Sequence, residues 1–205
     1  MANASAAFDF LFITERLSAK LGTATFGEVH LFAYLSCLLS LFRRQPVAEW
    51  GYNFAGLDQG APFSPELHAA YSDLESAGLV ASKGEAFILT PEGKQELESL
   101  SDLQQLEFRR PCLEAACDSL LSFPVGMVRN AMSMEPGLRP ALRVGGTRPL
   151  LDAGAIAQLH EHFDALYTVL GQTHDLLVPS TVWLTYLLEL SRKYDQDLAR
   201  VQGSR

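Results

Sequence analysis

The 205-residue sequence has few cysteines and no hydrophobic run long enough to cross a membrane. Its three cysteines are an odd number with no secretion signal before them, which predicts a reducing cytosol and no disulfide framework. The longest uncharged run, Val29–Phe42, is too short to span a bilayer and predicts a buried helix instead. We therefore expect a cytoplasmic protein that does not contact a membrane.

Motifs for catalysis and for phosphate or metal binding are also missing. The sequence has no GxGxxG or GxxxxGK[ST] phosphate loop, no GxSxG nucleophile elbow and no HExxH zinc motif. In the one histidine cluster, His160 and Asp164 share a helix face, whereas His162 points elsewhere. A metal needs three or four convergent ligands, so an amphipathic helix explains this cluster better. We expect a protein that is not an enzyme and binds no cofactor and no metal.

Basic residues are scarce as well. The chain has 16 lysines and arginines against 24 acidic residues, a formal net charge of −8. Proteins that bind nucleic acid alone usually present a basic domain, because phosphate contacts dominate their affinity. With 48% apolar and 20% charged residues, the composition instead favours apolar surface beyond the chain's own core, as subunits of stable complexes have.

Helical periodicity is what the sequence does contain, so we predict a mainly α fold. Ser64 and Thr90, each followed by a proline, predict two capped helix starts, and Gly78 predicts the end of the first helix. The remaining expectations are irregular structure over 1–25 with a short helix near Thr14–Leu21, a helix from Phe26 to about Arg44, a loop or short strands over 45–63, strands Leu79–Ser82 and Ala86–Leu89, and helices over Pro91–Arg110, Pro111–Leu121, Met127–Met132, Ala153–Gly171 and Pro179–Arg200.

The stretch "FSPELHAAYSDLESAGLVASKGEAFILTPEGKQELESL" resembles winged helix-turn-helix domains of the MarR and PadR type. The resemblance covers residues 60–100 and rests on a helix ending in "GLV", a β-hairpin and "LTPEG" opening the next helix. It implies a DNA-recognition helix over Ser64–Ala77, a β-hairpin wing after it, and helix Gly27–Arg44 before it. Function lies in the site and not in the fold, so this likeness alone does not imply DNA binding.

The order of elements over the whole chain gives a second resemblance. An N-terminal helix, a winged-helix middle, "LLSFPVGMVRNAM…EPGLR" and a helical tail are similar to the middle component of bacterial three-component ABC-ATPase defence systems, including the Lamassu type. This resemblance implies a non-catalytic adaptor between an SMC-like ATPase and an effector such as a nuclease. Together the two likenesses divide the chain into a winged-helix domain (1–110), a helix with an Arg-rich Pro/Gly connector (111–150) and a C-terminal helical region (151–205).

The charge of the predicted recognition helix argues against direct DNA readout. Readout needs Arg, Lys, Asn or Gln side chains at base edges and phosphates. The helix Ser64–Ala77 contains none of these residue types, and residues 60–110 contain nine acidic against four basic residues. Such a surface repels a phosphate backbone. Lys83, at the tip of the predicted wing, is the remaining candidate for a nucleic-acid contact, with an ordinary solvated turn lysine as the alternative.

Two further stretches are candidate contact surfaces. Between Leu121 and Leu150, four arginines stand against the single acid Glu135, namely Arg129, Arg139, Arg143 and Arg148. This basic strip either grips nucleic acid or an acidic partner, or is a solvated loop that pairs with the acidic protein itself. In the last predicted helix, Trp183, Tyr186, Leu187 and Leu190 form either a docking stripe for a partner or part of the core.

Three hypotheses from different classes remain. The first is a winged-helix adaptor subunit that binds proteins, with DNA contact only through the assembled complex. The second is a MarR- or PadR-like DNA-binding transcription regulator that dimerises through its C-terminal helices, and the third is an enzyme. The acidic, Arg-free recognition helix and the apolar excess favour the first hypothesis.

Overall fold

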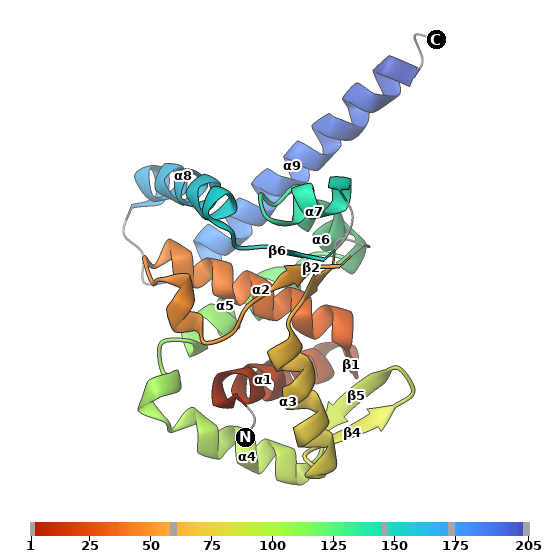
Figure 1. Ribbon diagram of the computed structural model, residues 1–205, viewed down its shortest axis with the longest axis vertical. Coiled ribbons are helices and arrows are strands. Elements are labelled where there is room, and N and C mark those ends of the chain that lie inside the picture. The colour runs from red at the N-terminus through yellow and green to blue at the C-terminus, as the bar shows by residue number, and fades with distance from the viewer. Residues whose placement is uncertain (1–2, 58–60, 145–146, 172–174, 203–205) are drawn as a thin grey trace.

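The computed structural model describes residues 3–57, 61–144, 147–171 and 175–202. These residues form nine α-helices, two short 3-10 helices and two small antiparallel sheets, so the predicted mainly α class is confirmed (Figure 1). The helices are α1 (Ala4–Leu21), α2 (Phe26–Phe42), η1 (Val47–Trp50), α3 (Pro65–Ser76), α4 (Pro91–Ser101), η2 (Gln104–Leu106), α5 (Arg110–Leu120), α6 (Val125–Met132), α7 (Leu138–Val144), α8 (Ala153–Leu170) and α9 (Leu177–Gln202).

The two sheets lie at different levels of the molecule (Figure 1). The first has the order β1-β5-β4 and lies beside α3, with Ala24 opposite Phe87 and Val80 opposite Leu89. The second has the order β3-β2-β6, in which β6 returns from far along the chain to place Pro149 opposite Ala55. The strands are β1 (Ala24–Thr25), β2 (Ala55–Gly56), β3 (Pro62–Phe63), β4 (Val80–Lys83), β5 (Ala86–Leu89) and β6 (Arg148–Pro149).

Local capping chemistry explains why the helices begin where they do. As predicted, the Ser64 side chain accepts the Leu67 N–H to cap α3, and the Thr90 side chain accepts the Gly93 N–H to cap α4. Gly78 has a φ of +72°, the left-handed conformation expected at the end of a helix. Gly93 has a packing role too, because a Cβ there would lie 2.0 Å from the Leu79 carbonyl oxygen.

The prediction of irregular structure over residues 1–25 is wrong. Residues Ala4–Leu21 form one continuous helix, α1, with a capping Asn3 side chain and ten buried residues. Asp9, a charged residue within this apolar helix, is fully buried inside the fold. A buried partner for that carboxylate, distant in sequence, is what allows the helix to continue through it.

The segment 122–150 is also more regular than a loop-rich connector. The expected short helix exists as α6, and it is followed by a further helix, α7, and by β6. Helix α6 packs against α9, and β6 joins the second sheet. One hydrophobic cluster runs from Ala6 to Leu188 and includes residues of all three predicted segments.

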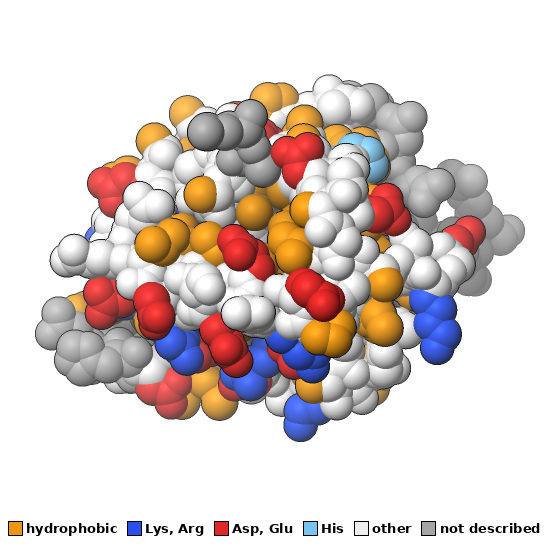
Figure 2. Space-filling view, turned by 90° about the horizontal axis from the view of Figure 1, so that it is seen from below, with side chains coloured by type: hydrophobic (Ala, Val, Ile, Leu, Met, Phe, Trp, Pro, Cys, Tyr) orange, Lys and Arg blue, Asp and Glu red, His pale blue; other side chains and the backbone are white. Residues whose placement is uncertain are grey.

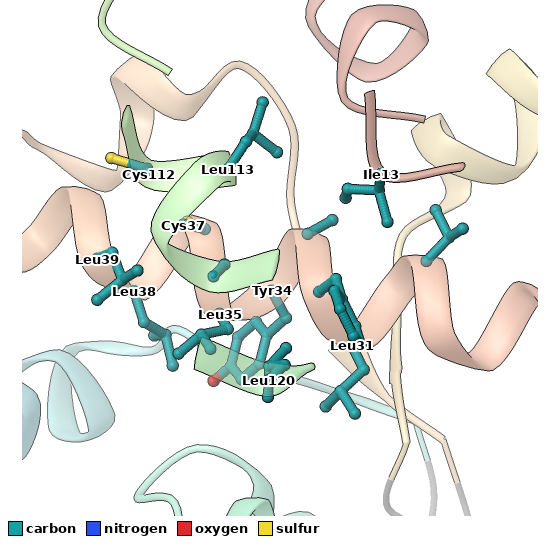
Figure 3. Packing of buried hydrophobic residues seen from close by; sticks show 14 of the residues in the cluster. Ile13, Leu31, Tyr34, Leu35, Cys37, Leu38, Leu39, Cys112, Leu113 and Leu120 are labelled. Carbon is teal, nitrogen blue, oxygen red and sulfur yellow. The ribbon is translucent and has the colours of Figure 1, made fainter. Parts of the chain in front are cut away.

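Helix α2 lies at the centre of this cluster, as its sequence predicted. Every residue from Val29 to Phe42 is buried. Figure 3 shows Leu31, Leu35 and Leu38 of α2 packed among side chains of neighbouring helices, including Leu113 and Leu120 of α5. A helix buried on all sides is a core element, so α1, α5 and α8 are arranged around α2.

A buried ion pair holds the N-terminal helix against the rest of the molecule. The Arg109 Nε donates to Asp9 Oδ1 at 2.9 Å, and its Nη2 forms the second bond of a bidentate pair with Oδ2. Both side chains are fully buried. The guanidinium also bonds the Trp50 carbonyl oxygen and lies 3.8 Å from the centre of the Trp50 ring, while the Tyr52 hydroxyl donates to Asp9.

This arrangement compensates for the cost of burying two charges. Burial by itself would lower the pKa of Arg109, but the charge and hydrogen bonds of Asp9 outweigh burial and raise the pKa above its ordinary value. Arg109 therefore stays charged. Removing one partner of such a pair is strongly destabilising, because it leaves the other charge buried and unpaired.

We predict that Arg109→Met lowers the free energy of unfolding by about 3–5 kcal/mol, because Asp9 loses its countercharge inside the core. The matched control is Arg110→Met, which removes the exposed ion pair between Arg110 and Glu114 and should cost less than about 1 kcal/mol. Urea unfolding of both variants checks this. Equal losses in the two variants would show that the buried pair contributes no more than a surface pair.

Candidate functional site

The exposed face of α3 and the hairpin β4–β5 offer little positive charge. Asp73 and Glu75 on α3 are exposed, as is Lys83 at the end of β4. Glu75 is held in a polar cluster, in which the Tyr71 hydroxyl donates to it at 2.6 Å and the Ser82 hydroxyl donates to the same oxygen. These donors, Ser82 first and Tyr71 second, lower the pKa of Glu75 and keep it ionised.

Most of the basic residues between 60 and 110 form ion pairs with carboxylates of the same chain. The Lys94 Nζ lies 3.0 Å from the Glu15 Oε1. Arg110 forms an ion pair with Glu114, and Arg109 forms one with Asp9. Acidic side chains are spread over the face seen from below in Figure 2. Of the four basic residues between 60 and 110, Lys83 is the one without an ion pair to a residue that the structure describes.

The structure separates the four arginines of the basic strip. Arg148, on β6, pairs with Asp152 at 3.3 Å, so it follows the self-pairing alternative. Arg139, on α7, is exposed and lies 5.6 Å from the centre of the Tyr194 ring of α9. Arg129 on α6 and Arg143 on α7 are exposed and form no ion pair with any residue in the described ranges. Arg129 and Arg143 thus remain available to a partner.

The single acid of this segment, Glu135, is withdrawn from the surface. Glu135 is fully buried, where its Oε2 accepts the N–H groups of Gly137 at 2.9 Å and Leu138 at 2.7 Å and the Tyr34 hydroxyl at 3.0 Å. Its carboxylate therefore accepts hydrogen bonds from two backbone N–H groups at the start of α7 from within the core. A charge count along the sequence includes Glu135 although it is buried. The count therefore understates the positive charge of the residues that the strip exposes.

Burial is also the main influence on the acidity of Glu135. Desolvation raises its pKa from 4.5 to about 7, against the three hydrogen bonds, which lower it. The second carboxylate oxygen, Oε1, is buried without a hydrogen-bond partner among the described residues. Both observations favour the protonated form at a pH where surface glutamates are fully ionised.

Two adjoining hollows lie between the N-terminal half of α2 and the pair α6–α7. They share Gly27, Leu31 and Arg129 as lining residues, and the larger has a volume of about 320 Å³. Their walls are largely apolar, with Leu21 and Phe123 lining one hollow and Leu142 the other. Sequence reasoning missed this groove, because it is formed by segments about a hundred residues apart. Arg129, one of the four arginines of the basic strip, is the predicted contact residue that lines it.

The proposed docking stripe on α9 is divided between core and surface. Trp183 and Leu187 are buried, with the Trp183 ring 5.3 Å from that of Phe163 on α8. Leu190 is partly buried and packs against the core. Tyr186 is 44% exposed and its ring lies 5.5 Å from that of His162. Most of the stripe therefore stabilises the fold, and Tyr186 is the member that a partner can reach.

The histidine cluster of α8 is dispersed. The Asp164 carboxylate forms an ion pair with Arg44, at the end of α2, and not with a histidine. Within the described residues, no group of three or more His, Cys, Asp or Glu side chains is placed to hold a metal ion. No helix in the described ranges is both long and apolar enough to cross a membrane.

Comparison with known proteins finds no matching family model, no matching curated protein and no matching solved structure. The geometry described above therefore has to support any functional proposal by itself.

We predict that the stability of the protein falls as the pH rises from about 4.5 to about 7 because of Glu135. An acid with a raised folded-state pKa binds more protons when folded than when unfolded in that interval, so deprotonation weakens the fold. The loss is of the order of 3 kcal/mol. Glu135→Gln should remove this slope, which urea unfolding at about pH 5 and pH 8 measures.

The comparison with wild type isolates Glu135. The buried His30, whose pKa is lowered by burial, gives a slope of opposite sign in both proteins and cancels in the difference. Glu114→Gln, on the surface of α5, is the matched control and should keep the wild-type slope. The same slope in wild type and Glu135→Gln would contradict this assignment.

Proposed function

We propose that the protein is a non-catalytic, winged-helix adaptor subunit that binds other proteins. The observation that supports this most directly is the exposed surface of α3. In a DNA reader of this type that helix presents cations and amides to the groove, whereas here it presents Asp73 and Glu75 and contains no Arg, Lys, Asn or Gln. A surface of this charge suits a protein partner better than a phosphate backbone.

The order of elements supports the winged-helix assignment. Strand β1, helices α2 and α3 and the hairpin β4–β5 follow one another, and β1 pairs with β5 to complete a three-stranded sheet. One feature departs from a simple helix-turn-helix, in which a turn of three or four residues joins the two helices. Here residues 43–64 separate α2 from α3 and include β2 and β3. The departure favours a use other than DNA reading.

The opposite end of the molecule supports partner binding. The C-terminal half of α9 projects from the body (Figure 1), and residues 192–197 on it are exposed. A projecting helix offers a partner a surface without disturbing the core. Arg129 and Arg143 are exposed on the neighbouring helices α6 and α7 and form no ion pair with a described residue, and arginine is enriched at protein interfaces.

The resemblance to three-component defence systems supplies the identity of the partners in this proposal. In that role the chain bridges an SMC-like ABC ATPase and an effector such as a nuclease in the bacterial cytoplasm. DNA then contacts the chain only within the complex, through Arg129, Arg139 and Arg143 of the basic strip. The three cysteines are buried, free thiols, as a cytoplasmic setting requires.

The alternative is a MarR- or PadR-like DNA-binding regulator. The observation that favours it is Lys83, which is exposed at the turn of the hairpin β4–β5, where a wing reaches DNA in that class of proteins. A single lysine supplies one phosphate contact, and specific DNA binders make many more. DNA binding as a regulator is therefore the less favoured of the two proposals.

We predict that the purified chain does not retard duplex DNA in a gel mobility assay at about 150 mM salt, because Lys83 is the single lysine or arginine in α3 and the hairpin β4–β5. Lys83→Glu should leave this result unchanged. Retardation by the wild-type chain that Lys83→Glu abolishes would establish the DNA-binding alternative.

We also predict that the chain co-elutes in gel filtration with an ATPase and an effector encoded by neighbouring genes when the three are expressed together. Arg139→Glu combined with Arg143→Glu should weaken this assembly at least about tenfold, since like charge opposes an acidic partner surface. Lys94→Glu combined with Arg110→Glu, two exposed cations outside α6, α7 and α9, is the matched control and should weaken assembly less. Elution of the wild-type chain alone would contradict the adaptor proposal.

A further inference from the structure

The two hollows beside α2 form one open groove, named here the α2–α6 groove and lined by Leu21, Gly27, Leu31, Phe123, Arg129 and Leu142. They share three lining residues, so they adjoin. Leu31 is buried at the base, whereas Leu21 is 49% exposed and Leu142 is 40% exposed. Large side chains exposed beside an apolar hollow are a mark of interaction surfaces.

At the groove the positive side chain is exposed, whereas the negative one is half-buried. Among the residues that the structure describes, its charged lining residues are Arg129, which lines both hollows, and Glu28, which lines one. One oxygen of the Glu28 carboxylate, Oε2, accepts the backbone N–H of Thr25 at 2.9 Å and the Thr25 hydroxyl at 2.8 Å in a capping box, which holds this side chain at the start of α2. Arg129 is exposed and has no ion pair within the part of the chain that the structure describes.

Neighbouring residues extend this positive character. Lys20 precedes Leu21 at the end of α1, and Arg143 follows Leu142 on α7, and both are exposed. Glu135, the acid of the α6–α7 segment, is buried and hydrogen-bonded to the start of α7. A chain with a net charge of −8 thus has three exposed cations that lie in the lining of an apolar groove or next to it in sequence, and none of them forms an ion pair with a residue that the structure describes.

We propose that the α2–α6 groove is the docking site for an acidic amphipathic helix of a partner protein. Leucine-like side chains at i, i+3, i+4 and i+7 would fill the two hollows, which is the usual helix-in-groove mode of recognition. Carboxylates beside that stripe would face Arg129 and the cations at either end. The inference rests on the proposed adaptor function and names the chemistry of the segment that the adaptor holds.

The apolar base of the groove favours a protein helix over nucleic acid. Nucleic-acid backbones are bound by polar and charged side chains and by backbone N–H groups, whereas Leu21, Leu31 and Leu142 provide hydrocarbon surface. Burying such surface is the main favourable contribution to protein association. The cations beside the groove then favour an acidic helix over other amphipathic helices.

The test compares two fluorescein-labelled helical peptides that differ in charge alone. Both have leucines at i, i+3, i+4 and i+7, with glutamates at the remaining positions in one peptide and lysines in the other. Because the whole chain has a charge of −8, non-specific attraction favours the lysine peptide. We expect fluorescence anisotropy to show the opposite, with the glutamate peptide bound at least about tenfold more tightly.

Variants of exposed residues locate the binding without disturbing the fold. Arg129→Glu and, separately, Leu142→Glu should each weaken binding of the glutamate peptide about tenfold or more, and Arg129→Glu should also remove the preference for glutamate over lysine. The matched controls are Arg192→Glu and Val169→Glu, an arginine and an 82%-exposed valine outside the groove, and they should bind as wild type. Unchanged circular dichroism confirms folding.

Several results would overturn the inference. These are tighter binding of the lysine peptide, equal binding of both peptides, and loss of binding that is as large in the two controls as in the groove variants. Competition by duplex DNA for the same groove, or concentration-dependent self-association that Leu142→Glu abolishes, would assign the groove to another occupant. The peptides do not require the ATPase or the effector, so failure here is distinct from failure of the wild-type chain to assemble with them.

Discussion

The buried pair of Asp9 and Arg109 is the interaction on which the arrangement of the molecule depends. It joins the first helix, α1, to the start of α5, and through Trp50 and Tyr52 it fixes the link that leaves the central helix α2. Helix α5 packs in turn against α2 and α9. The pair therefore couples the N-terminal half, with α3 and its hairpin, to the C-terminal half that contains the basic strip and the projecting helix.

Sequence reasoning succeeded where the determining contacts are local. Ser64 and Thr90 cap their helices through backbone groups three residues away, so both helix starts could be predicted. The α1 helix could not, because the partner that makes Asp9 tolerable in an apolar run is a hundred residues distant. Helix α7 was missed for the same reason, since the buried Glu135 that caps it also depends on Tyr34 of α2.

The candidate site shows the same division between local and distant contacts. Composition indicated which helix lacked cations and which segment was rich in arginine. Ion pairing separates those arginines, because Arg148 pairs with Asp152 while Arg129 and Arg143 are exposed and pair with no described residue. The stripe on α9 shows that periodicity alone does not separate core from interface, as Trp183 is buried and Tyr186 is half exposed. The groove beside α2 required the full set of tertiary contacts.

The central claim is that the chain uses α6, α7 and α9, and not α3, to bind its partners. Amide hydrogen exchange of the chain, alone and within its assembled complex, tests this most directly, since partner binding slows exchange in the covered elements. We expect added protection over α6, α7 and α9 and unchanged exchange at α3 and the hairpin β4–β5. Added protection at α3 and the hairpin, produced by duplex DNA without any protein partner, would contradict it.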